Sequence, residues 1–204
     1  MSVDKKKLER YQKIRYNGIN LYEAAETLVS FLGDLQDDNF KETPYRILKY
    51  LEEIGRGYDP AYIEEQLSRT FPSEYDEIVS VTNIDARSLC PHHFLPVIYK
   101  IDFAYLPDKK VLGLSKIIRI IRNLSLRPVL QEDLGEDIIN TFATLKPKGI
   151  MVVLRGVHTC MYGRGVKNRG VVVTSKVYGS FKDPSMKEEV MRLFRVSRDN
   201  PLDE

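Results

Sequence analysis

The sequence predicts an α+β protein in which an N-terminal helical region precedes an antiparallel sheet domain. Apolar residues recur at helical spacing through about the first 75 residues, and from about residue 77 the chain changes to β-branched, partly alternating runs. Two helical stretches divide those runs, which gives the order β-β-α-α-β-β and then a closing helix. Two hairpin-like strand pairs with helices on one face are typical of an α+β sheet domain.

The N-terminal region, residues 1–75, is expected to be helical throughout. Its charged first residues lead into a helix, and residues 19–34 carry apolar positions at helical spacing. A further helix is expected over residues 39–58, with Thr43 as its cap and Pro44 in its first turn, where no amide partner is needed. A short helix over residues 60–69 completes the region.

The second region, residues 76–204, is expected to form the sheet domain. Its strands are predicted over residues 77–88, 96–106, 149–157 and 171–178, and its helices over 114–124, 128–145 and 184–195. A tight Cys-Pro-His-His segment lies between the first two strands. No internal repeat or low-complexity linker separates the regions.

Composition restricts the classes of function. The chain has 204 residues, 31 basic and 29 acidic, with a net charge of +2. This near-balance argues against a general nucleic-acid-binding surface. No apolar run approaches the ~20 residues of a membrane span, and the N-terminus lacks the apolar segment of a secretory signal. We therefore expect a cytoplasmic protein without nucleic-acid or membrane partners.

Histidine and cysteine are confined to two short windows. The chain has three histidines and two cysteines in all. They are Cys90, His92 and His93 in the first window and His158 and Cys160 in the second. Thiolate and imidazole are ligands that zinc prefers, and a catalytic zinc site uses three protein ligands and leaves one position for water. Neighbouring residues of an extended strand point to opposite faces, so one of His92 and His93 can bind metal while the other acts on substrate.

Three alternatives compete with a catalytic metal site. The two cysteines could form a disulfide, which a reducing cytosol disfavours. The histidines could be ordinary core residues, but these would be scattered along the chain. A closed structural zinc site with four protein ligands is the strongest alternative.

Two further segments could bind an anionic purine substrate. Ser115, Lys116 and Arg119 open a helix, whose N-terminus attracts phosphate, and Arg164 lies between two glycines. The alternative for these residues is a solvated basic surface. Gln131 and Glu132 begin the next helix, and a carboxylate there could accept two N–H bonds from guanine or simply complement the helix dipole.

The residues together resemble the GTP cyclohydrolase I family. The resemblance is carried by Cys90-Pro-His-His93, Gly113-Leu-Ser-Lys116, Arg127-Pro128, Gln131-Glu132, His158-Thr-Cys160 with Arg164-Gly165, and Thr43-Pro44-x-Arg46. It covers roughly residues 40 to 195 in matching order and spacing.

This resemblance implies a tunnelling fold (T-fold), in which subunit sheets join into a barrel and two rings stack as a homodecamer with active sites at subunit interfaces. It implies Zn²⁺ held by Cys90, His93 and Cys160, and His92, His158 and Ser115 as catalytic residues. The implied substrate-binding residues are Glu132, Gln131, Lys116, Arg119 and Arg164, with Arg46 and Lys49 from a neighbouring subunit.

The implied reaction is hydrolysis of GTP to 7,8-dihydroneopterin triphosphate and formate, the first step of pterin, folate or deazapurine synthesis. Three positions depart from the family's usual pattern. Pro91 replaces a glutamate, residues 166–173 have little serine or threonine, and Asp133 stands where a basic residue is common. Two alternative functions are therefore a T-fold purine hydrolase that stops at the opened formamide or uses another purine, and a non-catalytic zinc-stabilised assembly or regulatory protein.

Overall fold

A computed structural model describes residues 3–196 of the chain. The chain forms two compact units, which divide between Arg56 and Gly57. Residues 57–75, which the sequence groups with the N-terminal helices, lie within the second unit. Among residues 3–196, no helix combines the length and apolar character needed to cross a membrane.

The first unit is a small helical cluster. Its elements are α1 (Lys5–Lys13), β1 (Arg15–Tyr16), β2 (Ile19–Asn20), α2 (Leu21–Ser30) and α3 (Thr43–Gly55). Asp4 and Asn20 cap α1 and α2, because each side chain accepts hydrogen bonds from backbone N–H groups of the first helical turn. Tyr11, Tyr45 and Leu48 are buried together in the core of this unit.

The helix expected over residues 39–58 is shorter than predicted. It begins at Thr43, and its cap residue is Glu42, which makes no side-chain capping bond, so the prediction that Thr43 is the cap is wrong. Consecutive turns precede the helix, since the Thr43 N–H donates to the Phe40 carbonyl at 2.8 Å. Pro44 lies in the first turn as predicted.

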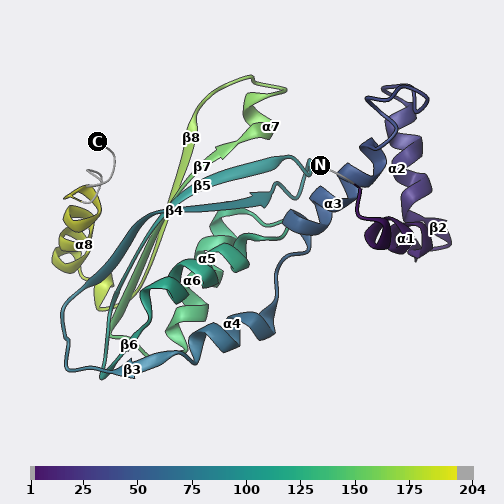
Figure 1. Ribbon diagram of the computed structural model, residues 1–204. Coiled ribbons are helices and arrows are strands. Elements are labelled where there is room, and N and C mark those ends of the chain that lie inside the picture. The colour runs from purple at the N-terminus through teal and green to yellow at the C-terminus, as the bar shows by residue number, and fades with distance from the viewer. Residues whose placement is uncertain (1–2, 197–204) are drawn as a thin grey trace, which may run out of the picture. The chain divides into compact units, whose positions relative to one another are not determined.

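The second unit is built on a four-stranded antiparallel sheet in the order β4-β5-β7-β8 (Figure 1). These strands are β4 (Val79–Leu89), β5 (Pro96–Leu106), β7 (Gly149–His158) and β8 (Val171–Gly179). The predicted order β-β-α-α-β-β is thus confirmed. Two short strands that the sequence did not predict, β3 (Thr70–Pro72) and β6 (Lys110–Leu112), form a separate antiparallel pair.

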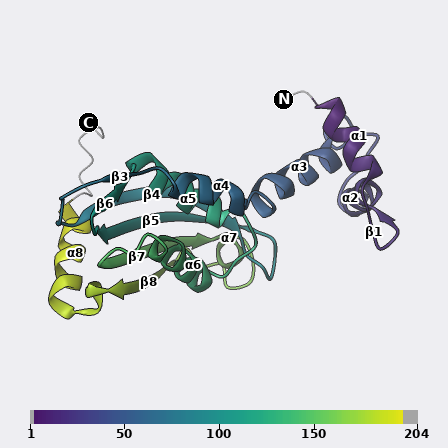
Figure 2. The same cartoon turned by 90° about the horizontal axis from the view of Figure 1, so that it is seen from below.

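Helices cover one face of the sheet, as predicted, and a further helix packs on the other. The helices of this unit are α4 (Pro60–Leu67), α5 (Leu114–Ser125), α6 (Gln131–Ala143), α7 (Thr159–Tyr162) and α8 (Pro184–Val196), with a 3₁₀ turn, η1 (Ser180–Lys182). Side chains of α5 and α6 form the main core with Phe103 and Val152 of the sheet. Their strand neighbours Ala104 and Met151 lie on the other face and pack with α8, because side chains alternate between the faces of a strand. Figure 2 shows α8 at the end of the sheet away from α7.

Candidate metal centre and active site

The ends of three strands and the start of one helix meet at one end of the sheet. Leu89, the last residue of β4, pairs with Pro96, the first of β5. His158, the last residue of β7, pairs with Val97. Pro128, shortly before α6, forms a bridge with Leu89. The two windows that contain all histidines and cysteines are therefore brought together by sheet pairing.

The Cys-Pro-His-His segment is a turn. The N–H of His93 donates to the Cys90 carbonyl at 3.3 Å, and the N–H of Phe94 donates to the same oxygen at 2.8 Å. Phe94 has a positive φ of 51°. Pro91 occupies the second position of this turn, which its fixed φ favours. The predicted tight segment between the two strands is confirmed, but the argument from alternating strand faces does not apply to His92 and His93, because this turn reverses the chain between β4 and β5.

Three side chains form a cluster that could hold a metal ion. The ligand atoms of Cys90, His93 and Cys160 all lie within 4.8 Å of one another. Both cysteines are free, so they are not joined as a disulfide. Two thiols and one imidazole are a donor set that suits zinc, and three protein ligands match an open, catalytic coordination sphere. The chemistry of the residues therefore fits the metal that the sequence resemblance implies.

The thiols of the cluster influence each other. Burial raises the pKa of Cys160, and the hydrogen bond and negative charge of Cys90 raise it further. Nδ1 of His93 lies 3.5 Å from the Cys90 sulfur. A bound cation would stabilise both thiolates, since the thiolate is the form of cysteine that binds metal.

His92 lies beside this cluster without belonging to it. Its Nδ1 is 3.9 Å from the Cys90 sulfur, and its ring centroid is 6.2 Å from that of His93. The side chain is exposed. An exposed imidazole next to a metal site can exchange protons with a bound substrate.

His158 is held by Gln131 at the start of α6. Its Nε2 lies 2.9 Å from the Gln131 side-chain oxygen. The ring meets the edge of the buried Tyr99 ring at a centroid distance of 6.4 Å. Burial lowers the pKa of His158, and the nearby negative charge of Glu132 partly opposes this effect.

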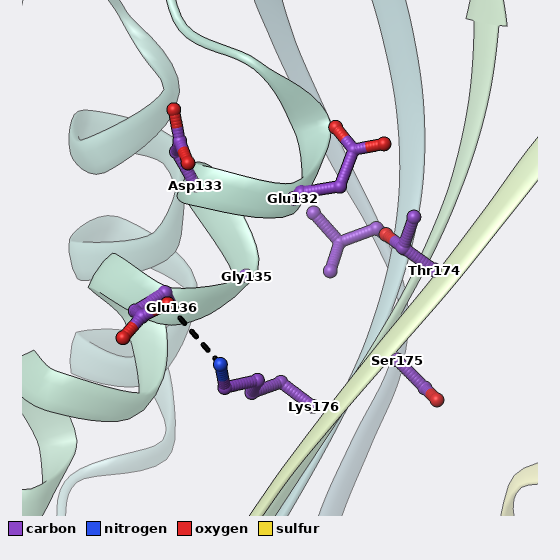
Figure 3. A pocket seen from close by; sticks show the side chains of 8 residues that line it. Glu132, Asp133, Gly135, Glu136, Thr174, Ser175 and Lys176 are labelled. Atoms are coloured by element: carbon purple, nitrogen blue, oxygen red, sulfur yellow. Dashed lines mark hydrogen bonds and ion pairs between the residues drawn. The ribbon is translucent and has the colours of Figure 1, made fainter.

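Glu132 lines a hollow between α6 and β8 (Figure 3). The hollow has a volume of about 310 Å³ and includes Glu136, Thr174 and Lys176. Lys176 forms an ion pair with Glu136 at 3.1 Å. Glu132 is exposed in the first turn of α6 and could accept hydrogen bonds from a ligand.

The predicted phosphate-binding residues lie on two other elements. Ser115 and Arg119 are exposed on α5, and Lys116 on the same helix is partly buried. Arg164 is exposed just after α7, next to Gly165, which has a positive φ of 58°. Among residues 3–196, no hydrogen bond or ion pair joins these side chains to the metal cluster.

Arg46 and Lys49 belong to α3 of the first unit. Arg46 is exposed and pairs with Glu42 at 2.6 Å, and Lys49 is partly buried.

Two supporting residues were missed by the sequence analysis. The hydroxyl of Thr159 donates to the Pro96 carbonyl at 2.7 Å and thereby ties the start of α7 to β5. Tyr99 is fully buried against His158 and lies 3.4 Å from the Ser88 hydroxyl. Strand alternation places Tyr99 on the inner face of β5, but no sequence signal indicates which histidine it meets.

Comparison of the sequence with known proteins identifies a family. A family model described as GTP cyclohydrolase I matches residues 21–195. The chain is 37% identical to GTP cyclohydrolase 1 of Aquifex aeolicus (strain VF5), over 96% of this chain and 99% of the relative. It is 38% identical to GTP cyclohydrolase 1 of Sulfurihydrogenibium sp. (strain YO3AOP1), over 95% and 96%. The enzyme of that name from Homo sapiens is 37% identical, over 86% and 72%.

Proposed function

The chain belongs to the GTP cyclohydrolase I family, and we propose that it is a zinc-dependent enzyme that hydrolyses GTP to 7,8-dihydroneopterin triphosphate and formate. The observation that carries this proposal is the cluster of Cys90, His93 and Cys160, with His92 beside it, in a chain matched to this family over most of its length. The strand order, with α5 and α6 on one face, supports a T-fold. A homodecamer in the cytoplasm is part of the same proposal.

We assign the metal site to Cys90, His93 and Cys160. When bound there, zinc supplies Lewis-acid activation of a water molecule. The other residues of the site bind and orient the purine and move protons.

His158 is proposed to protonate N7 of the guanine ring, which makes C8 more electrophilic. An imidazole suits this step because its pKa lies near the working pH. Addition of water at C8 and cleavage of the C8–N9 bond give a formamide, and a second water releases formate. The ribose then rearranges to a ketose, with His92 and Ser115 handling the protons, and ring closure releases one water.

The substrate is proposed to bind through both of its ends. Glu132, exposed at the hollow beside α6, accepts hydrogen bonds from the guanine N–H groups. Ser115, Lys116, Arg119 and Arg164 contact the ribose and triphosphate, and the N-terminus of α5 adds free backbone N–H groups. Arg46 and Lys49 are proposed to reach a neighbouring subunit's site.

The proposal is tested by mixing the zinc-loaded protein with GTP and measuring pterin absorbance and formate in parallel. Equal amounts of pterin and formate are expected. Formate or an opened pyrimidine without pterin would point to the shorter reaction, and Pro91→Glu would then test whether the proline is responsible. No turnover of GTP by protein with zinc bound would refute the assignment and favour the non-catalytic alternative. The variants His92→Ala and His158→Ala should lose activity while they retain zinc.

A further inference from the structure

The side chain of Gln131 is buried, and both its amide nitrogen and its oxygen have hydrogen-bond partners within the protein. Only 2% of the residue is exposed. Its amide nitrogen lies 3.2 Å from the Leu154 carbonyl and 3.1 Å from the Val172 carbonyl, and its oxygen lies 2.9 Å from Nε2 of His158. The Thr174 hydroxyl, at 3.1 Å, is a third neighbour of the nitrogen.

These neighbours determine which way the amide points. Backbone carbonyls only accept hydrogen bonds, so the two donors of the Gln131 NH₂ group must face Leu154 and Val172. The reversed amide would place its oxygen against those two carbonyl oxygens and leave three acceptors together in a buried site. The Gln131 oxygen therefore faces His158. Because that oxygen can only accept, Nε2 of His158 must carry the proton.

We propose that Gln131 is a positioning residue that holds the His158 ring with Nε2–H directed at the Gln131 side-chain oxygen, so that Nδ1 is the ring nitrogen left to face a substrate. Among residues 3–196, no hydrogen bond to Nδ1 of His158 is found. The catalytic part of this inference rests on the proposed function, whereas the tautomer follows from the contacts alone.

The packing around Gln131 leaves this arrangement little freedom. Gly156 lies beneath the amide, and a Cβ atom at that position would be only 2.3 Å from the Gln131 oxygen. The same Cβ would lie 2.9 Å from the ring of Tyr99, which also packs against His158. A glycine at residue 156 therefore allows the amide to reach the imidazole.

This role differs from the contact with substrate that the sequence resemblance implies. A side chain that is 2% exposed and has its donors and acceptor satisfied offers nothing to guanine without breaking those bonds. The neighbouring Glu132 is exposed and remains the candidate for the purine. Loss of the Gln131 amide should therefore affect proton transfer and leave substrate binding in place.

The tautomer can be measured directly by ¹⁵N NMR on protein labelled only at histidine. The chain has three histidines, and the signals of His158 are assigned by their absence from the His158→Asn variant. Above about pH 8, where an imidazole is neutral, zinc-loaded protein should show a protonated Nε2 and an unprotonated Nδ1 for His158. A protonated Nδ1 with a bare Nε2 would overturn the proposal.

Kinetics on two variants and a control test the positioning role. Gln131→Met keeps the approximate shape and removes the amide, and Gly156→Ala displaces it. Each should lower kcat for GTP by about 10- to 100-fold, the range for losing a partner that orients an imidazole, with KM little changed. Gln66→Met is the matched control, since Gln66 is a buried glutamine, 3% exposed, on α4. It should leave kcat and the His158 spectrum as in the parent protein.

The outcomes separate this inference from the proposed function. If the parent protein shows the Nε2–H tautomer and Gln131→Met shifts it, the positioning role stands even if GTP is not the substrate. A raised KM with an unchanged kcat in Gln131→Met would instead indicate a direct contact with guanine and refute the inference. Unchanged kinetics and an unchanged His158 spectrum in Gln131→Met would refute it as well.

Discussion

Replacement of Cys160 by serine should remove most of the metal affinity while leaving the fold intact. Cys160 contributes one of the three ligand atoms that lie within 4.8 Å of one another. Structural zinc sites with four protein ligands bind with about 10–16 kcal/mol. An equal share for each of four ligands is about 2.5–4 kcal/mol, which corresponds to a Kd weaker by roughly 60-fold to 10³-fold.

The affinity is measured by competition with a chromophoric zinc chelator, and the amount of zinc retained is measured after gel filtration. His92→Ala is the matched control, because His92 lies in the same turn but outside the three-residue cluster. It should retain zinc and lose activity. Cys160 is only partly buried on a short helix, so the metal-free Cys160→Ser variant should unfold near the temperature of the metal-free parent, since bound zinc would stabilise only the parent.

A Cys160→Ser protein that binds zinc as tightly as the parent would refute the assignment of this ligand. Titration of thiols gives an independent check, because the chain contains only two cysteines. Because Cys90 is buried and Cys160 is only partly buried, a thiol reagent should label Cys160 faster than Cys90 in metal-free protein, and bound zinc should slow the labelling of both. Shielding of one thiol only would point to a different ligand set.

Three further predictions concern stability. The hydrogen bond from Tyr11 and the charge of Arg10 lower the pKa of Glu52 in the folded protein despite its burial. The ionised Glu52 therefore stabilises the fold above the unfolded pKa of about 4.3. This stabilisation is lost as the pH falls through the lower pKa of the folded state. Glu52→Gln should flatten the acid side of the stability curve of the first unit, measured by thermal unfolding against pH. Asp102 is 2% exposed and forms an ion pair with Arg155. Arg155→Leu should lower the free energy of unfolding by about 3–5 kcal/mol, because it leaves a buried charge without a partner. The double variant with Asp102→Leu should recover much of that loss, and urea titrations measure both values. Gly179→Ala should lower the unfolding temperature, because Gly179 has a φ of 62° and its new Cβ would lie 2.2 Å from a backbone oxygen; an unchanged melting curve would contradict this.

Much of the fold could be predicted from local patterns. Alternating β-branched runs located β4, β5, β7 and β8 within a few residues, and apolar spacing located α5 and α8. These elements have strong periodicity, which is a property of the sequence itself. Where the signal was weak, the boundaries were wrong. The helix expected from residue 128 begins at Gln131, because Leu130 is extended.

Other elements have no sufficient local signal. The strands β3 and β6 are only three residues each, and they exist because they pair with one another across a long stretch of chain. The helix α7 is a single turn tied down by the contact of Thr159 with Pro96. Such elements depend on a partner that is distant in the sequence, so periodicity cannot reveal them.

The sequence by itself determined the chemistry of this protein. It placed all the histidines and cysteines in two windows, which indicated a metal site, and its resemblance to the GTP cyclohydrolase I family implied the ligands and a purine substrate. Only the tertiary structure decided how these groups meet. The pairing of Leu89 with Pro96 and of Val97 with His158 brings the windows together, and the burial of Gln131 against two carbonyls orients the amide toward His158. Residue type sets what a side chain can donate or accept, but the direction of a hydrogen bond depends on neighbours that only folding supplies.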